Sequence, residues 1–401
     1  MFYINEKNFL FKDYTEFFED INNLLTIHTC KRYKKTYDFY VNLIAGIINN
    51  IDITILDGNI LDAEFDDVIK TNNIKNTTYK NSLNIINTDN MYDVLTSFTD
   101  VKLTLFTSGT TGTPKKVSHK LSSLIQSVKV KENYKGNIWG LAYNPTHIAG
   151  IQVFFQAILN TNTIIDIYDT RRNFILKSLK KYKITNISAT PTFYRLLLPL
   201  PEEFNLIKQV TVGGEKSDKN LIDKLKVSFK NARITNIYAS TEAGQILKSK
   251  GDFFKIDNRF VKIDKKEILI HKTLIGDNDF SNGEWYKTGD LIEYIDSKKD
   301  YFKIIARKND LINSGGYMVN LNEVEEIILK INGVRDVRVY TKNNAVIGNL
   351  ILCEIELFSD IILSERDIKI ELTSRLQPHK IPRIIKIVDV ILKTKTGKKI
   401  R

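Results

Sequence analysis

Strands and helices alternate through residues 138–238, and this alternation constrains the fold more than any other feature of the 401-residue sequence. Apolar runs typical of buried strands stand at 138–143, 163–167, 184–188, 209–212 and 234–238. Segments with the apolar spacing of helices lie between them, at 148–159, 173–181 and 218–229. Such alternation predicts a largely parallel sheet covered by helices on both faces. Ligands of these folds bind at the carboxyl ends of the strands, so the loops that begin there are the first candidates for a functional site.

The segments on either side complete the prediction of an α/β fold. Before this region we expect helices at 15–27 and 36–49, a strand at 53–56 and an irregular polar stretch at 71–90. After it, short strands with polar turns indicate a β-rich subdomain, at 266–271, 291–295 and 301–305. Further helices and strands alternate to the end, at 321–331, 336–341, 346–358, 365–376 and 384–390. We therefore expect a large N-terminal region of mostly parallel sheets plus the β-rich subdomain, and a small, mobile C-terminal α+β domain, with bounds of 1–308 and 309–401.

Charge and composition argue against several classes of protein. The net charge is +12, from 59 basic and 47 acidic residues, but the lysines are scattered and no aromatic-basic face marks a nucleic-acid site. Such a charge also suits polyanionic small molecules or an acidic partner protein. No run of 18 apolar residues predicts a membrane span, and the N-terminus lacks the features of a secretory signal. Cys30 and Cys353 stand far apart in apolar surroundings, which favours buried free thiols in a cytoplasmic protein. The sequence does not specify an oligomeric state.

A loop rich in small hydroxyl residues follows the apolar run at 103–106, which is typical of a buried strand. The loop consists of Thr107, Ser108, Gly109, Thr110, Thr111, Gly112, Thr113, Pro114 and Lys115. Its glycines let backbone N–H groups approach an anion closely, and Lys115 adds positive charge. Ser118 is suited to cap a helix running to about residue 131. Strand, loop, lysine and helix in this order predict a phosphate-binding site.

Two alternatives to this interpretation were weighed against the spacing. An ordinary P-loop needs Gly-x-x-x-x-Gly-Lys-Ser/Thr, but counting from Gly109 puts Pro114 at the second glycine and Lys116 at the Ser/Thr position. A flexible surface loop is the other alternative. Residues 107–115 instead resemble the signature loop of the adenylate-forming superfamily. That superfamily includes acyl- and aryl-CoA synthetases, the adenylation domains of nonribosomal peptide synthesis, and firefly luciferase.

Further motifs resemble those of the same superfamily and follow in its order. They are Gly-Gly-Glu at 213–215, Tyr-Ala-Ser-Thr-Glu at 238–242, Tyr-Lys-Thr-Gly-Asp at 286–290, a hinge motif at 306–319, and Thr-Gly-Lys at 396–398. The second departs from the usual Tyr-Gly-x-Thr-Glu because Ala239 replaces glycine. Alone, each has an ordinary explanation: a plain turn, a helix cap or a solvated lysine tail. Together they cover roughly residues 100–401, and the compact length is closest to o-succinylbenzoate–CoA ligase-like and aryl-acid-activating members.

The resemblance implies a set of nucleotide-binding residues: Thr107, Ser108, Gly109, Thr110, Thr111, Gly112, Lys115, Gly213, Gly214, Glu215, Tyr238, Ala239, Ser240, Thr241, Asp290 and Arg307. By the same resemblance, Tyr238 packs on the adenine, Thr241 contacts the AMP phosphate and Asp290 accepts hydrogen bonds from the ribose, which Arg307 also touches. Glu242 holds Mg²⁺, as a carboxylate that shares the ion with phosphate oxygens can. The resemblance also implies that Lys398 is the catalytic lysine, which acts on the α-phosphate, and that Asn309 is the hinge residue.

His147 carries the information on the acid substrate. Amino-acid-activating relatives have an Asp in this region to pair with the α-ammonium, whereas acyl- and aryl-CoA ligases commonly have His. An imidazole can bond a carboxylate and is a poor partner for an ammonium, so we expect a non-amino carboxylic acid. The alternative is that His147 only caps the apolar helix at 148–159. A second histidine, His119, is expected to be structural.

Three functions follow from these residues. The first is ATP-dependent formation of an acyl-adenylate, with loss of pyrophosphate, and transfer of the acyl group to coenzyme A or to a carrier protein's phosphopantetheine. The catalytic residues would then be Lys398, Thr241, Glu242 and His147. The second is amino-acid adenylation for a carrier protein, and the third is nucleotide binding without catalysis. The missing Asp argues against the second, and the intact carboxylates and lysine argue against the third.

Overall fold

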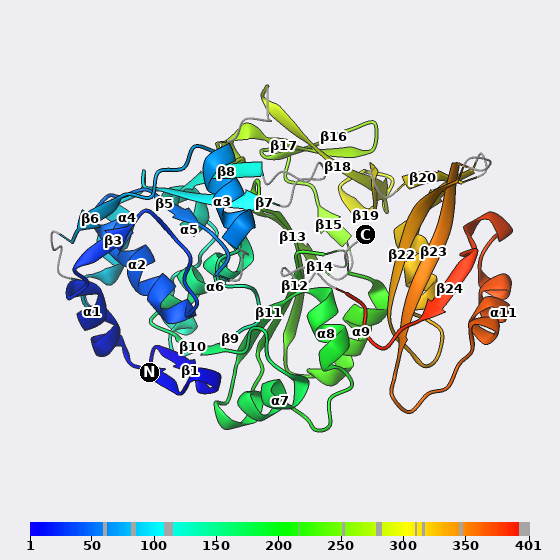
Figure 1. The fold of residues 1–401 in the computed structure, drawn as a ribbon, viewed down its shortest axis with the longest axis horizontal. Helices are drawn as coiled ribbons and strands as arrows, with labels where there is room; N and C mark the ends of the chain where they lie inside the picture. The colour runs from blue at the N-terminus through cyan, green and yellow to red at the C-terminus, as the bar shows by residue number, and fades with distance from the viewer. Residues whose placement is uncertain are drawn as a thin grey trace.

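The computed structural model describes the chain except residues 59–61, 82–85, 108–114, 216, 251–252, 278–282, 309–310, 315–316, 345–347 and 393–401. The described residues confirm a mixed α/β fold with a large N-terminal domain and a small C-terminal one, which lies at the right of Figure 1. Residues 108–112, the predicted hinge residue Asn309 and the predicted catalytic residue Lys398 lie outside the described residues. For Thr107 and Lys115 only the backbone is described.

The predicted parallel sheet forms the centre of the large domain. Its parallel strands run side by side in the order β13 (Arg233–Ser240), β12 (Gln209–Gly213), β11 (Asn186–Ala189), β9 (Ile138–Leu141), β10 (Thr163–Asp166) and β1 (Tyr3–Asn5). The antiparallel strand β2 (Leu10–Lys12) ends the sheet beyond β1. The sequence does not predict β1, because three residues are too few to show a periodicity. Its partner β10 lies about 160 residues further along the chain.

Helices cover both faces of this sheet, as expected. One face packs against α6 (Ile148–Ile158) and the N-terminal helices. The other packs against α7 (Arg172–Lys181), α8 (Pro191–Leu197) and α9 (Lys219–Ser228). The helices at 148–159, 173–181 and 218–229 are thus confirmed to within two residues, because each has a clear apolar stripe and a clear end.

The N-terminal part of the large domain adds small sheets and its own helices. Strands β4 (Cys30–Lys31), β5 (Ile53–Ile55), β7 (Lys102–Thr107) and β8 (Lys115–Lys120) form one sheet, and β3 (Thr26–His28) pairs with β6 (Thr78–Lys80). The helices are α1 (Tyr14–Asn22), α2 (Thr36–Ile48), α3 (Asp62–Thr71), α4 (Met91–Ser97) and α5 (Leu121–Ile125). Helix α3 is not predicted by the sequence. Cys30 and Cys353 are buried free thiols, as expected.

The helix expected to begin at Ser118 is wrong. Residues 115–120 form β8, which pairs antiparallel with β7 so that the backbone of Thr107 lies opposite that of Lys115. Ser118 caps nothing, since its Oγ lies 2.8 Å from Thr104 Oγ1 across the two strands. The helix that follows is short and begins at Leu121. The hydroxyl-rich loop therefore connects two strands of a hairpin rather than a strand and a helix.

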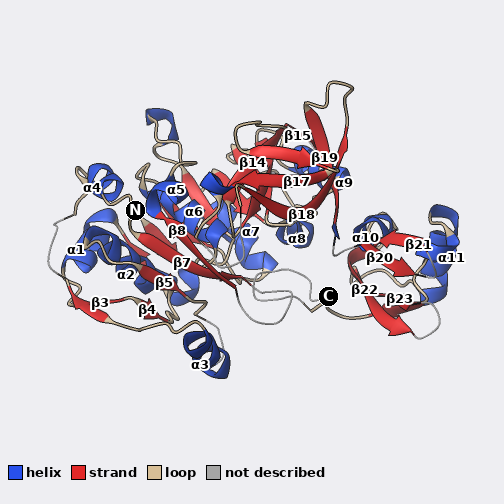
Figure 2. Cartoon of the chain, turned by 90° about the horizontal axis from the view of Figure 1, so that it is seen from above, coloured by secondary structure: helices blue, strands red, loops and turns tan. Residues whose placement is uncertain are grey.

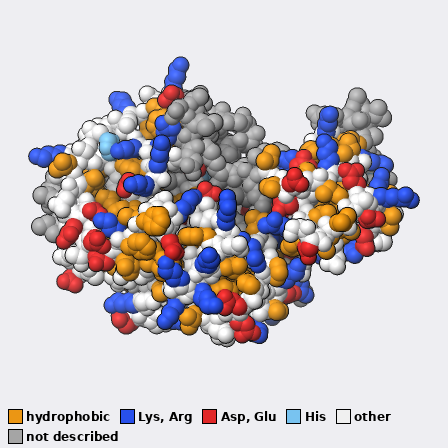
Figure 3. Space-filling model, turned by 60° about the horizontal axis from the view of Figure 1, so that its bottom comes forward, with side chains coloured by type: hydrophobic (Ala, Val, Ile, Leu, Met, Phe, Trp, Pro, Cys, Tyr) orange, Lys and Arg blue, Asp and Glu red, His pale blue; other side chains and the backbone are white. Residues whose placement is uncertain are grey.

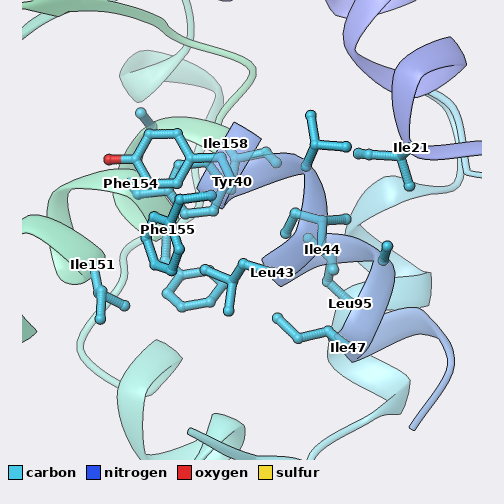
Figure 4. Packing of buried hydrophobic residues seen from close by; sticks show 14 of the residues in the cluster. Ile21, Tyr40, Leu43, Ile44, Ile47, Leu95, Ile151, Phe154, Phe155 and Ile158 are labelled. Atoms are coloured by element: carbon cyan, nitrogen blue, oxygen red, sulfur yellow. The ribbon is translucent and has the colours of Figure 1, made fainter. Parts of the chain in front are cut away.

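A large apolar core joins α2, α6 and the central sheet. Figure 4 shows Tyr40 and Leu43 of α2 beside Phe154 and Phe155 of α6, and Ile44 and Ile47 of α2 closer to Ile21 and Leu95. The rings of Tyr40 and Phe154 stack with their centroids 3.9 Å apart and their planes 14° apart. Both side chains are fully buried, so this contact fixes α6 against the N-terminal helices. The position of α6 matters because its opposite side lines the site.

The predicted β-rich subdomain continues the central sheet in an antiparallel arrangement. Beyond β13 the order is β14 (Gly244–Lys250), β15 (Phe253–Lys255), β19 (Tyr301–Arg307), β18 (Trp285–Tyr294), β17 (Glu267–His271) and β16 (Val261–Asp264). Strands β18 and β19 pair so that Asp290 lies opposite Arg307. The hairpin therefore brings the predicted ribose-binding residues together.

The small domain is the predicted α+β unit and has its own apolar core. Its elements are β20 (Leu311–Ser314), β21 (Tyr317–Asn320), α10 (Leu321–Ile328), β22 (Val334–Asn344), β23 (Gly348–Leu357), α11 (Glu365–Arg375) and β24 (Ile384–Ile387). Figure 2 shows this group set to one side of the large domain. Helix α10 is the part whose side chains reach the site described below.

The surface in Figure 3 carries Lys and Arg side chains scattered among acidic and apolar ones, with no continuous basic stripe on the face in view. Across the described segments, no helix combines the length and apolarity that crossing a bilayer requires.

Candidate functional site

A cavity of about 960 Å³ opens at the carboxyl ends of the parallel strands and extends back along one face of the sheet. Its walls come from the central sheet, from α6, from the β18–β19 hairpin and from α10 of the small domain. All the predicted site residues whose side chains or glycine backbones are described line it: His147, Gly213, Gly214, Glu215, Tyr238, Ala239, Ser240, Thr241, Glu242, Asp290 and Arg307. Motifs up to 160 residues apart in the sequence therefore share one site.

Asp290 is held in a fixed orientation by contacts to both of its carboxylate oxygens. The Tyr238 hydroxyl donates to Oδ2 at 2.6 Å, and the Arg307 Nε lies 3.1 Å from Oδ1. Burial, together with the charge of Asp290, raises the pKa of the Tyr238 hydroxyl, so the phenol keeps the proton that it donates. An oriented carboxylate of this kind can accept hydrogen bonds from neighbouring hydroxyl groups of a ligand.

The turn before Asp290 depends on Gly289 and on Glu267, a residue that the motifs do not include. Gly289 has a φ of +76°, a conformation that other residues rarely adopt. Its N–H donates to Glu267 Oε1 at 2.9 Å, and the other oxygen of Glu267 accepts from Lys308 Nζ at 2.6 Å. Glu267 is 6% exposed, so it acts as a buried anchor for the turn and for the residue next to the proposed hinge.

His119 positions the loop that carries Thr241 and Glu242. Its Nε2 lies 2.7 Å from the Thr241 carbonyl oxygen, and the backbone N–H of Gly276 donates to the Glu242 carbonyl at 2.8 Å. Burial lowers the pKa of His119, so the imidazole is neutral and donates Nε2–H. The structural role expected for His119 is confirmed, and the structure adds that the loop it holds is one of the predicted motifs.

The carboxylate of Glu242 lines the cavity, and within the described part of the chain it forms no ion pair. The described residues also contain no group of three or more His, Cys, Asp or Glu side chains arranged to hold a metal ion. This donor set fits Mg²⁺ rather than a metal enclosed by protein ligands, because Mg²⁺ takes one or two carboxylates and completes its shell with phosphate oxygens and water.

The Gly213–Glu215 turn presents backbone to the cavity. Gly214 has a φ of +82°, and the Gly213 carbonyl accepts a hydrogen bond from the Tyr143 hydroxyl at 3.2 Å. Glu215 Oε2 accepts from both the N–H and the hydroxyl of Thr192, at 3.2 and 2.7 Å. Its buried Oε1 has no hydrogen-bond partner among the described residues. The turn therefore offers one acceptor to a ligand.

His147 stands at the N-cap position of α6, but its side chain makes no capping hydrogen bond. The capping alternative is therefore not supported. Its Nε2 lies 3.7 Å from Asp57 Oδ2, which also accepts from the Asn144 side chain at 2.9 Å. Asp57 is thus a site residue that the motifs miss, and its only signal in the sequence is its position directly after the strand at 53–56. The imidazole remains about one-third exposed, toward the cavity.

Family models of known proteins match a segment of each of the two domains. The family model described as "AMP-binding enzyme" matches residues 55–259, and that described as "AMP-binding enzyme C-terminal domain" matches residues 323–398. The chain is 28% identical over 353 residues to 4-hydroxybutyrate–CoA ligase 1 of Metallosphaera sedula, covering 75% of this chain and 61% of that ligase. It is 27% identical over 324 residues to 2-succinylbenzoate–CoA ligase of Listeria monocytogenes, covering 73% of this chain and 67% of that ligase.

A solved structure shares the fold over most of its length. The chain is similar to O-succinylbenzoate coenzyme A synthetase from Bacillus subtilis in complex with ATP and magnesium ion, with a TM-score of 0.67 and 18% identity. The match covers 91% of this chain and 85% of the synthetase.

Proposed function

The chain belongs to the AMP-binding enzyme family, and from that premise we propose that it activates a non-amino carboxylic acid, aryl or acyl, with ATP. A carboxylate oxygen of the acid attacks the α-phosphorus of ATP, the bond from that phosphorus to the β-phosphate breaks, and pyrophosphate leaves as the acyl-adenylate forms. The observation that carries the proposal is the gathering of motif residues from across the large domain around one cavity, with Asp290 held on both oxygens.

Each part of the nucleotide has a partner in this proposal. Asp290 accepts from the two ribose hydroxyls, Arg307 supports it, and the ring of Tyr238 packs on the adenine. The 107–115 loop and Thr241 contact the phosphates. Glu242 holds Mg²⁺, which neutralises phosphate charge when bound. The ATP and magnesium bound to the Bacillus subtilis synthetase support this assignment.

His147 supports the choice of a non-amino acid. The His147 imidazole lines the cavity and can donate to a carboxylate, whereas the Asp57 carboxylate beside it is not among the lining residues and so is not placed to pair with a substrate ammonium. The thiol that accepts the acyl group is coenzyme A or the phosphopantetheine of a carrier protein. Coenzyme A is favoured, because the relatives named above are CoA ligases.

Lys398 and Asn309 complete the proposed cycle. Lys398 stabilises the negative charge that builds on the α-phosphate in the transition state. The small domain then pivots at Asn309 and withdraws Lys398, which admits the thiol. The side chains of α10 that line the cavity are consistent with a small domain that closes over the nucleotide.

The proposal is tested by ATP–pyrophosphate exchange with a panel of aryl, acyl and amino acids, each with and without coenzyme A. Exchange with a non-amino acid is expected. A properly folded chain that supports exchange with none of the panel would refute the catalytic assignment, and exchange with amino acids alone would favour amino-acid adenylation.

The role of Lys398 has a sharper test with a matched control. Lys398→Ala should lower adenylation about 10²–10³-fold while thioester formation from preformed adenylate is largely spared. Lys399→Ala, one residue on, should leave both steps within about twofold of the wild type. An equal loss of both steps in Lys398→Ala contradicts the assigned role.

A further inference from the structure

The loop that carries Thr241 and Glu242 is held in place through its backbone. The Thr241 carbonyl accepts from His119 on β8, and the Glu242 carbonyl accepts from the N–H of Gly276, at 2.7 and 2.8 Å. Gly276 belongs to none of the predicted motifs and lies in the connection that follows β17 in the β-rich subdomain. Because both contacts use carbonyl oxygens, they fix the loop without using its two functional side chains.

The same connection also pairs with β8, the strand that follows the predicted phosphate-binding loop. The Ser118 N–H donates to the Asp277 carbonyl at 2.9 Å, and the Asp277 N–H donates to the Ser118 carbonyl at 2.8 Å. Strand β7 pairs with β8 along its other edge. Gly276 and Asp277 are called the brace below, because these two residues join β8 to the loop of Glu242.

Only glycine fits at position 276 without displacing its neighbours. A Cβ atom at this position would lie 2.8 Å from the Ser118 carbonyl oxygen and 2.9 Å from two atoms of the His119 ring. The Ser118 carbonyl accepts the Asp277 N–H and the His119 ring holds Thr241, so neither can move away without loss of a contact. The φ of Gly276 is not in the left-handed region, so close packing rather than conformation requires the glycine.

The side chain of Asp277 contributes little to the brace. Its Oδ2 lies 2.8 Å from Lys102 Nζ, but the two side chains are 71% and 42% exposed, and solvent screens such ion pairs. The backbone hydrogen bonds to Ser118 and to Glu242 are therefore the contacts that hold the two segments together. A change of the Asp277 side chain alone leaves these backbone contacts in place.

We propose that Gly276 is a positioning residue for adenylation, which fixes the Glu242 carboxylate relative to β8 through the brace. This inference rests on the proposed function, in which Glu242 holds Mg²⁺ and Lys115, the first residue of β8, binds the nucleotide. Mg²⁺ demands a nearly ideal octahedral arrangement of carboxylate, phosphate and water oxygens. A shift of Glu242 relative to β8 therefore weakens the binding of ATP with Mg²⁺ and leaves the binding of the acid unchanged.

Gly276→Ala tests the proposal by two measurements. In ATP–pyrophosphate exchange with the best acid of the panel, the Mg²⁺ concentration for the half-maximal rate should rise about tenfold or more, and KM for the acid should stay within about twofold, because misplacement by about 1 Å can cost up to about 10²-fold. Calorimetric titration needs no turnover. There the dissociation constant for ATP with Mg²⁺ should rise about tenfold, and that for ATP in EDTA less than about threefold, since the ribose contacts of Asp290 are untouched.

Two variants serve as matched controls. Gly140→Ala crowds a glycine of β9 to a similar degree, since its Cβ would lie 2.9 Å from Ile167 Cδ1, but Gly140 is not among the residues that line the cavity. Asp277→Ala removes the contact to Lys102 and keeps both backbone hydrogen bonds to Ser118. Both controls should leave the Mg²⁺ requirement within about twofold of the wild type.

A second variant keeps the test decisive if Gly276→Ala does not fold. Asp277→Pro removes the N–H that donates to the Ser118 carbonyl, and Asp277→Ala is its control, because both variants lose the side chain and only proline lacks the donor. The dissociation constant for ATP with Mg²⁺ should be about fivefold higher in Asp277→Pro than in Asp277→Ala, as expected for the loss of one hydrogen bond. Equal constants for the two variants would overturn the positioning role.

The two proposals fail in different ways. A folded Gly276→Ala whose Mg²⁺ requirement is unchanged, or whose KM for the acid rises as much as that requirement, overturns the positioning role and leaves the proposed function standing. An equal rise of the Mg²⁺ requirement in Gly140→Ala also overturns it. A wild type that supports no exchange with any acid refutes the proposed function. In that case, weaker binding of ATP with Mg²⁺ by Gly276→Ala in calorimetry still supports the positioning role.

Discussion

Removal of one hydroxyl group, in Tyr238→Phe, tests whether the oriented carboxylate of Asp290 matters for nucleotide binding. The phenylalanine keeps the ring that is proposed to pack on the adenine and loses only the donor that lies 2.6 Å from Asp290 Oδ2. In the variant, Arg307 still holds Oδ1. The side chain of Asp290 then has one fixed oxygen instead of two, and it must be reoriented when the ribose binds.

The size of the effect follows from the kind of bond that is lost. A hydrogen bond to a charged acceptor contributes about 1.5–3 kcal/mol net, which corresponds to about 10–150-fold in a dissociation constant. Because Arg307 and the backbone of the turn keep part of the orientation, we expect the lower end of this range. The dissociation constant for ATP should therefore rise about tenfold, with KM for the acid unchanged.

Calorimetric titration of ATP measures the effect, and Tyr37→Phe is the matched control. The Tyr37 hydroxyl also donates to a carboxylate, Asp20 Oδ2, at 2.6 Å, but it lies in the N-terminal core rather than at the cavity. Both variants should lose stability to urea, and only Tyr238→Phe should lose affinity for ATP. If Tyr238→Phe binds ATP within twofold of the wild type, the orientation of Asp290 by Tyr238 has no role in binding.

Three further predictions concern the packing that holds the site. His119→Gln keeps a donor for the Thr241 carbonyl, whereas His119→Leu leaves that carbonyl unpaired. His119→Leu should therefore lower the free energy of unfolding by about 1–3 kcal/mol and remove much of the exchange activity. Similar activity of the two variants would contradict the positioning role. Because burial lowers the pKa of His119 below its ordinary 6.5, the unfolded chain binds a proton below about pH 6.5 that the folded chain excludes. As the pH falls, the free energy of unfolding of the wild type should therefore decrease by up to about 1.4 kcal/mol per pH unit relative to that of His119→Gln. Urea unfolding at pH 7.5 and 5.5 measures this difference, and an equal pH dependence of the two proteins would refute it. Phe154→Ala, which removes the ring stacked on Tyr40, should cost about 3–5 kcal/mol, while the exposed Phe11→Ala should change stability by less than about 0.5 kcal/mol.

Local pattern was enough to predict the central layers of the fold. The helix at 148–159 was predictable because its apolar residues repeat over three turns and a polar segment precedes it. The hairpin of β7 and β8 was not predictable in the same way. Its second strand is short and lysine-rich, and it forms because it pairs with a buried strand across the loop. Tertiary pairing there overrides the local signal of Ser118 as a cap.

The candidate site likewise contains residues that local pattern could predict and residues whose role depends on tertiary contacts. The motif residues could be predicted from the sequence to lie together, because their types and order resemble those of a known superfamily, and the described ones line one cavity. Asp57 could not be predicted, and for His119 only a structural role could be expected and not its partner, since each acts on a group 87 or more residues away and belongs to no pattern of its own. The cavity-lining face of the central sheet, which carries Asn186, Ser188, Gln209 and Thr211, lies between these cases. Its alternating Asn, Ser, Gln and Thr residues are visible in the strands at 186–190 and 209–213, but their meaning depends on which face borders the cavity.

Glu267 shows how nucleotide binding and the proposed domain movement can depend on one side chain. One of its oxygens fixes the N–H of Gly289, next to Asp290, and the other pairs with Lys308, next to the proposed hinge. The Asn320 side chain also donates to the Ile305 carbonyl at 2.9 Å, which ties the small domain to β19. A pivot at Asn309 therefore lies between two anchored points. Rotation of the small domain must break the Asn320 contact, while Glu267 keeps Lys308 and the ribose turn with the large domain. The proposed nucleotide site can thus remain intact when the small domain moves, as the proposed two-step reaction on one bound adenylate requires.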